Sequence, residues 1–119
     1  MERNYKIYIS EVNGDKYIEM IFDDNKYDII SGLLNSNIVY ISDKNPWIDT
    51  IDKVLKGNSK KEYIFLEAYN IIIEKERTNI EFEYSEDELL EIETKEFQNI
   101  LEIWFKNLEE FNKSGKVLD

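Results

Sequence analysis

The sequence predicts an α+β domain in which an antiparallel sheet of about five strands carries a long C-terminal helix packed on one face. Three observations predict this fold class. Apolar and polar residues alternate in the first quarter of the chain and again in the third, which is the period of a half-buried strand. The last quarter places large apolar side chains at helical spacing. With 119 residues, we expect residues 1–119 to form a single domain around one core.

The first quarter predicts a β-hairpin over residues 5–22. Ile7 and Ile9 alternate with polar or exposed-type neighbours, and Met20 belongs to a second alternating run. Between the two runs stands Asn13-Gly14, a dipeptide that readily adopts the positive φ angles of a tight hairpin turn. The turn and its flanks therefore favour two antiparallel strands.

Two short elements are expected after the hairpin. Apolar residues at helical spacing predict a short helix over Tyr27–Leu34, although Gly32 lowers the stability of a helix in that position. The apolar run Ile38–Ile41 predicts a brief buried strand, which ends at a polar segment before Pro46.

A second helix is predicted over residues 46–56. Pro46 suits the first turn of a helix, and Asn45 is expected to be its N-cap. Gly57 is expected to end the helix. Trp47 lies on the apolar face, so we expect it in the core, with a role as a partner anchor as the alternative.

The third quarter predicts the centre of the sheet. Residues 62–75 are rich in β-branched and aromatic types, which predicts one long central strand covered on both sides. Residues 76–79 are expected to form a turn. In residues 80–84, Ile, Phe and Tyr alternate with Glu, so we expect three inward apolar side chains and outward carboxylates. A further short strand is expected over Leu89–Ile92.

The C-terminal helix carries the strongest pattern in the sequence. Thr94 is expected to be its N-cap, Glu96 favours the positive end of the helix dipole, and Gly115 is expected to end it. Six large side chains follow helical spacing and are expected to cover the sheet: Phe97, Ile100, Leu101, Trp104, Leu108 and Phe111.

The composition excludes several chemistries. The chain has no His and no Cys, which removes Ser-His-Asp and Cys-His nucleophiles, imidazole and thiolate metal ligands, and disulfides. A formal net charge of −11 argues against direct nucleic-acid binding. We find no phosphate-binding loop or nucleophile elbow, so we expect no enzymatic activity, no catalytic residues, no metal and no cofactor. No signal sequence or membrane span is predicted, which favours a cytoplasmic protein that makes no membrane contact.

Acidic residues concentrate between residues 81 and 93. These thirteen residues hold seven acids and no Lys or Arg. If Glu81 and Glu83 belong to one strand, both point to the same face, about 6.6 Å apart. Such a patch could be a solvated face that keeps the protein soluble, or a docking surface for a basic partner. Solubility does not require this density, so we favour docking.

A second group of acids precedes and opens the short helix. Asp23, Asp24 and Asp28 superficially fit a calcium-binding loop. The alternating acids and the central Gly of such a loop are missing, so ordinary turn chemistry is the preferred interpretation.

The C-terminal half resembles a known class of proteins. The stretch Tyr63–Glu76, the segment Leu89–Thr94 and the helix Phe97–Phe111 with Trp104 are similar to small immunity proteins of bacterial contact-dependent inhibition and related polymorphic toxin systems. The resemblance covers about the last half of the chain and rests on size, charge and a strand-strand-helix ending. It implies a compact acidic α+β protein of the cytosol, encoded beside a toxin whose effector domain is often a nuclease.

The hypothesis that follows is an immunity protein that occludes the active site of a cognate basic toxin with its acidic surface. An acidic nucleic-acid mimic that inhibits a defence complex, or a non-catalytic adaptor or structural subunit, stays open as an alternative. The expected partner-binding residues are Glu81, Glu83, Glu86, Asp87 and Glu88, together with Asp23, Asp24 and Asp28.

Overall fold

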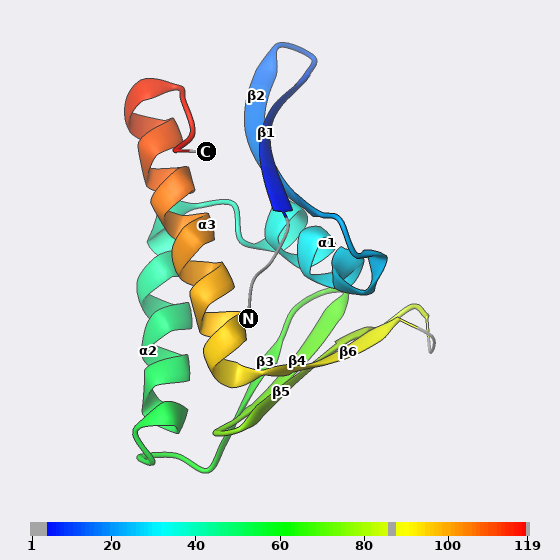
Figure 1. The fold of residues 1–119 in the computed structure, drawn as a ribbon, viewed down its shortest axis with the longest axis vertical. Helices are drawn as coiled ribbons and strands as arrows, with labels where there is room; N and C mark the ends of the chain where they lie inside the picture. Colours follow the sequence, from blue (N-terminus) through cyan, green and yellow to red (C-terminus); the bar gives the residue numbers. More distant parts are fainter. Residues whose placement is uncertain (1–4, 86–87, 119) are drawn as a thin grey trace.

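The computed structural model describes residues 5–85 and 88–118. In this part of the chain, two antiparallel sheets and three α-helices are arranged as Figure 1 shows. The elements in chain order are β1 (Tyr5–Val12), β2 (Asp15–Phe22), α1 (Asp28–Asn37), α2 (Lys44–Leu55), β3 (Lys61–Phe65), β4 (Tyr69–Glu74), β5 (Arg77–Phe82), β6 (Leu89–Glu93) and α3 (Thr94–Ser114). The predicted α+β class is confirmed.

The prediction of one sheet of about five strands is wrong. β1 and β2 form a two-stranded sheet of their own, and β3–β4–β5–β6 form a four-stranded sheet. The free edge of β2 lies against α1, where the Met20 N–H donates to Asn35 Oδ1 at 3.1 Å. A helix side chain therefore satisfies a donor that a neighbouring strand would otherwise have used.

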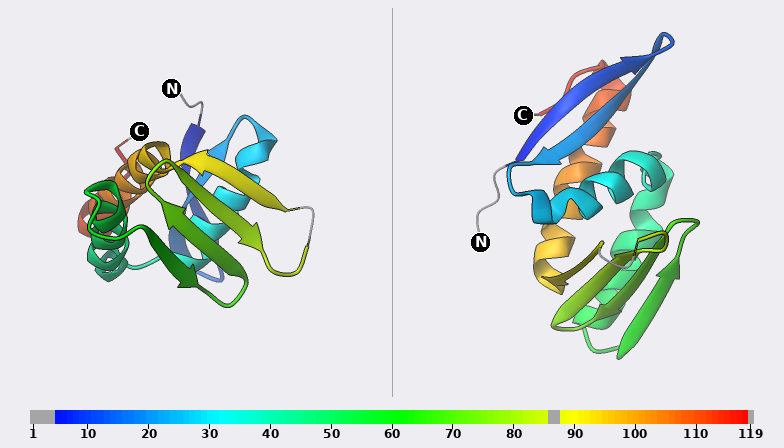
Figure 2. Two further views of the ribbon diagram at one scale, coloured as in Figure 1. Left: turned by 90° about the horizontal axis from the view of Figure 1, so that it is seen from below. Right: turned by 90° about the vertical axis from the view of Figure 1, so that its right-hand side faces the viewer.

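α1 lies between the two sheets, while α2 and α3 run side by side along one side of the molecule (Figures 1 and 2). α1 contacts both β2 and β5, while α2 and α3 pack side by side against one face of the four-stranded sheet. The Trp104 indole N–H donates to the Ile38 carbonyl at 2.7 Å and fastens α3 to the segment after α1. The largest fully buried side chains include Trp104, Phe97, Phe105, Met20, Ile30, Leu33, Leu34, Ile71, Ile73 and Ile80.

The N-terminal hairpin follows the prediction. Val12 pairs with Asp15, and the two turn residues Asn13 and Gly14 have φ angles of 53° and 87°. Both angles are positive, as a two-residue hairpin turn of this kind requires.

The predicted long strand over residues 62–75 is two strands. Leu66 donates its N–H to the Tyr69 carbonyl at 2.8 Å and closes a two-residue turn at Glu67-Ala68. Neither turn residue is Gly or Pro, so the sequence has no typical turn-forming residue at the point where the chain reverses. This stretch therefore supplies two strands to the sheet where the sequence predicted one.

Three smaller predictions are also corrected. Ile38–Ile41 is not a strand, because the Ile38 carbonyl accepts from Trp104 and a 3-10 turn begins at Ile41. Asn45 is not the cap of α2, which begins one residue earlier, at Lys44. Tyr84 does not point inward, since β5 ends at Phe82 and the Tyr84 side chain is 72% exposed.

α3 confirms the strongest sequence prediction. Gly115 ends the helix with a φ of 74°, and its N–H donates to the Phe111 carbonyl at 2.8 Å. Thr94 is the first helical residue and not the N-cap; its hydroxyl donates to the Glu74 carbonyl and contacts the Thr78 hydroxyl at 2.9 Å. Among the described residues, no helix has both the length and the apolar character needed to cross a membrane.

Candidate protein-binding surface

The four-stranded sheet has one covered face and one open face. Its covered face places Ile71, Ile73 and Ile80 against the helices, while the opposite face turns outward (Figure 2). The cross-strand register places the following residues together on this open face: Lys61, Tyr63, Phe65, Asn70, Ile72, Glu74, Arg77, Asn79, Glu81, Leu89, Glu91 and Glu93.

At one end of the sheet, acids are matched by bases. This paired end contains the β4–β5 turn, where Lys61 Nζ lies 3.7 Å from Glu74 Oε1. Arg77 Nε lies 3.6 Å from Glu91 Oε1 on the neighbouring strand. Because both pairs join adjacent strands, they reduce the local charge on this part of the open face.

At the other end, acids gather without such matching. This acidic end consists of Asp28, Glu67, Glu83 and Glu88, all of them exposed. Glu83 follows β5, and its N–H donates to the Ala68 carbonyl at 2.7 Å, which places it beside the turn that holds Glu67. Within residues 5–85 and 88–118, none of these four carboxylates forms an ion pair with a Lys or Arg.

A hollow of about 600 Å³ opens between α1 and this end of the sheet. Asp28 lines it from the first turn of α1, and Glu88 lines it from the segment before β6. Lys26 is the base among its lining residues, and its Nζ lies 5.0 Å from the centroid of the Tyr27 ring. The apolar part of the wall is formed by Ile29, Tyr69, Phe82, Leu89 and Leu90. A cationic side chain could lay its aliphatic stem on this wall and its charge between two carboxylates.

Tyr69 joins the helix to the acidic end. Burial raises the pKa of its phenol above the ordinary value of 10.0, a hydrogen bond with the Ser36 side chain lowers it, and the negative charge of Glu88 raises it again. The phenol also explains Gly32, since a Cβ on this residue would stand 2.5 Å from Tyr69 Oη. The glycine that weakens α1 as a helix is the residue that lets the sheet approach it.

The structure separates the predicted docking residues of the acidic stretch. Glu81 lies on the open face, where Asn70 Nδ2 is 3.5 Å from its Oε1. The prediction that Glu83 shares this face through one strand is wrong, because β5 ends before it. Glu88 lies at the hollow, and Glu86 and Asp87 lie outside the described residues.

The earlier acidic group divides in a similar way. Asp28 lines the same hollow as Glu88, although sixty positions separate them in the chain. Asp24 accepts the Lys26 N–H at 3.0 Å, which is ordinary turn chemistry, and Asp23 is exposed beside it. Glu67 was not among the predicted residues, because its turn falls where the sequence predicts the middle of a strand. Tyr69 was not among them either, and the sequence signal for it is Gly32 inside a helical pattern.

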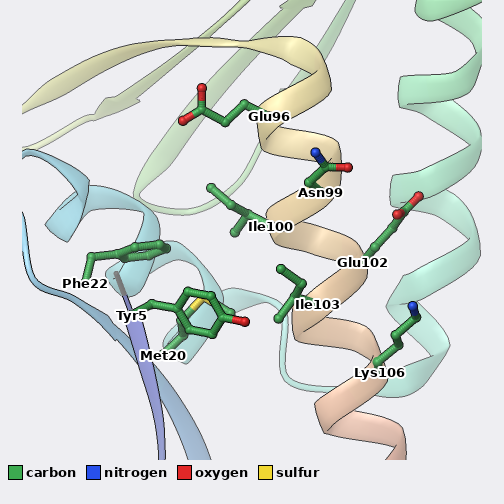
Figure 3. Close-up of a pocket in the computed structure, with 9 residues that line it drawn as sticks. All are labelled: Tyr5, Met20, Phe22, Glu96, Asn99, Ile100, Glu102, Ile103 and Lys106. Carbon is green, nitrogen blue, oxygen red and sulfur yellow. The ribbon is translucent and has the colours of Figure 1, made fainter. Parts of the chain in front are cut away.

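Two further hollows are lined by none of the predicted docking residues that the structure describes. One of about 290 Å³ lies between the hairpin and α3, where Figure 3 shows Tyr5, Met20 and Phe22 facing Ile100 and Ile103. Another of about 580 Å³ lies between β2, α1 and α3 and shares Gly32 and Tyr69 with the hollow at the acidic end. In the described part of the chain, no three carboxylates lie close enough to hold a metal ion.

Trp47 has the place expected of a core residue. Its side chain is buried, and its ring meets that of Phe97 edge-on at 6.2 Å between centroids.

Comparisons of the chain with protein-family models, with curated proteins and with solved structures found no match.

Proposed function

We propose that the protein is an immunity protein that binds a basic toxin domain through its acidic end and blocks the toxin's active site. The observation that carries the proposal is that Asp28, Glu67, Glu83 and Glu88 lie at one end of the sheet and form no ion pair among the described residues, although Lys26 lines the same hollow as Asp28 and Glu88. Unmatched exposed carboxylates keep their attraction for an external cation, whereas a carboxylate in an ion pair has lost part of it.

The hollow at this end gives the proposal its contact chemistry. An Arg or Lys of the partner enters between Asp28 and Glu88 and packs its methylene groups on Phe82 and Leu90. Toxin domains that act on RNA or DNA use such cations to hold phosphates, so occupying them with carboxylates blocks substrate binding. The mechanism needs rigid positioning of acids and no catalytic group. It predicts fast association that slows as salt is added.

The experiment begins with the neighbouring gene and ends in a protection assay. We expect that gene to encode a large secreted protein with a small basic C-terminal domain. Cells that express this domain should survive when the present chain is co-expressed. The triple variant Asp28→Lys, Glu83→Lys, Glu88→Lys should fail to protect them.

The matched control reverses the same number of charges at the paired end: Glu74→Lys, Glu76→Lys and Glu91→Lys. It should retain protection, and circular dichroism should show both variants folded. Full protection by the acidic-end variant, or equal loss of protection by the control, would contradict the proposal.

A further inference from the structure

β3 is an edge strand that leaves backbone groups unpaired. The order β3–β4–β5–β6 places it at the rim of the sheet, with β4 on one side (Figure 2). Because Leu66 and Tyr69 form the hydrogen-bonded pair next to the turn, alternation along the ladder directs the N–H and C=O groups of Tyr63 and Phe65 away from β4. In the described part of the chain, these outward groups have no hydrogen-bond partner. The Lys61 carbonyl on the same edge accepts from the Ser59 hydroxyl at 3.2 Å.

The same two residues expose an aromatic pair beside that edge. Tyr63 is 53% exposed and Phe65 is 68% exposed, and their rings are stacked with centroids 5.8 Å apart. Edge strands of soluble proteins are commonly protected by Pro, a bulge or several charges. β3 has no Pro, its ladder with β4 is regular, and the charge on its open face is Lys61 at one end.

The residues that alternate along this edge are complementary to themselves when the strand is reversed. Lys61, Tyr63 and Phe65 alternate along β3, and Glu67 follows them in the turn that joins β3 to β4. In an antiparallel pair of two copies, with Ile64 of each copy at the two-fold axis, Tyr63 lies opposite Phe65 of the other copy. Lys61 faces the β3–β4 turn of the other copy, where Glu67 competes for its ammonium group with Glu74 of the same chain. A shift of two residues either way places Lys61 opposite Phe65 or Tyr63 opposite Glu67, and the approach of Lys61 to Glu67 is lost.

We propose that β3 is a homodimerisation edge, and that a second copy of this chain pairs with it in this register to form one continuous antiparallel sheet. Tyr63 and Phe65 exchange backbone hydrogen bonds across the axis, and their four rings form one aromatic cluster on the open face. The two Glu67 carboxylates stand six residues apart along the strand direction, about 20 Å, so they repel weakly at moderate salt.

The test is analytical ultracentrifugation of the full chain from micromolar to millimolar concentration, at low and high salt. We expect a monomer–dimer equilibrium that shifts toward the dimer as salt screens the net charge of −11 on each copy. This direction is opposite to that expected for a basic partner, so failure of the dimer and failure of the proposed function are distinguishable.

Charge exchange tests the register. Lys61→Glu should weaken the dimer by about tenfold or more, because like charges then face each other. The double variant Lys61→Glu, Glu67→Lys should recover it. Lys60→Glu changes the net charge equally, lies one residue before β3 and should weaken the dimer less. Tyr63→Pro, which removes an outward donor that β4 does not use, should also weaken it.

A parent chain that stays monomeric at millimolar concentration in high salt would overturn the proposal. This outcome would also be seen if β3 paired only with a strand of another protein. A dimer that Lys61→Glu weakens no more than Lys60→Glu, or a folded double variant that does not recover the dimer, would overturn it as well.

Discussion

The two ends of the four-stranded sheet carry the same kind of side chain in different surroundings. At the paired end, Glu74 and Glu91 face Lys61 and Arg77 across neighbouring strands. At the acidic end, Glu83 and Glu88 have no such neighbour among the described residues, and Asp28 adds a further carboxylate from α1. The difference shows that cross-strand register, more than the local count of acids, decides which carboxylates remain available to a partner.

The largest expected effect comes from breaking the contact that holds α1 against the acidic end. Gly32→Ala would place a methyl group 2.5 Å from Tyr69 Oη. Such overpacking costs about 1–3 kcal/mol, and the better helix propensity of Ala returns at most about 1 kcal/mol. We therefore expect a net loss in the free energy of unfolding, measured by urea denaturation.

Tyr69→Phe supplies the control for that substitution. It removes the oxygen and leaves the ring carbon Cζ at 3.6 Å from the added methyl group, which is an ordinary contact. Gly32→Ala should therefore lower the free energy of unfolding less in the Tyr69→Phe variant than in the parent chain. Strict additivity of the two changes would show that the phenol is not what requires the glycine.

The next effect is an alkaline loss of stability. Burial raises the pKa of Tyr69 in the folded chain above 10.0, so the folded state holds this proton more tightly than the unfolded state. The contribution of the protonated Tyr69 phenol to the free energy of unfolding is fully present below pH 10.0. It is lost as the pH rises through the raised pKa of Tyr69 in the folded chain. Urea unfolding of the parent and of Tyr69→Phe should show a steeper alkaline decline for the parent. Parallel declines would contradict this role of Tyr69.

The smallest effects should have opposite signs at the two ends. Glu91→Gln removes an exposed ion pair with Arg77 and should lower the free energy of unfolding by at most about 1 kcal/mol. Glu88→Gln removes one of several mutually repelling acids and should raise it by a few tenths of a kcal/mol at low salt. Thermal denaturation with and without salt measures the change in stability caused by each substitution, and added salt should make each change smaller. If both substitutions changed the stability in the same direction, the two ends of the sheet would not differ as described.

The elements with strong periodicity or strong turn chemistry could be predicted from the sequence. Asn13-Gly14 fixed the first hairpin, and Gly115 correctly marked the end of α3. The reversal at Glu67-Ala68 could not be predicted, because neither residue is a typical turn former and Ile-rich strands flank it. The hairpin is separate from the larger sheet, and the outer edge of β2 bonds instead to α1 through Met20 and Asn35, a tertiary contact that no local sequence pattern indicates.

The candidate surface could be predicted only in part, because local sequence patterns do not report tertiary contacts. The concentration of acids between residues 81 and 93 was visible, yet Glu91 belongs to an ion pair and Glu88 to the hollow. Their assignment depends on the pairing of β5 with β6 and on the approach of α1. The sequence indicates that Gly32 lowers the stability of α1. It does not indicate why a glycine is needed there, because the Tyr69 phenol that approaches Gly32 lies thirty-seven positions later in the chain.

The most direct test of the account is a titration of the isotopically labelled protein with a deca-lysine peptide, followed by amide chemical shifts in nuclear magnetic resonance spectra. The account predicts that the largest changes occur at Asp28, Glu67, Glu83 and Glu88, that they shrink as salt is added, and that Glu74 and Glu91 change much less. Changes of equal size at both ends of the sheet, or largest at the paired end, would contradict it.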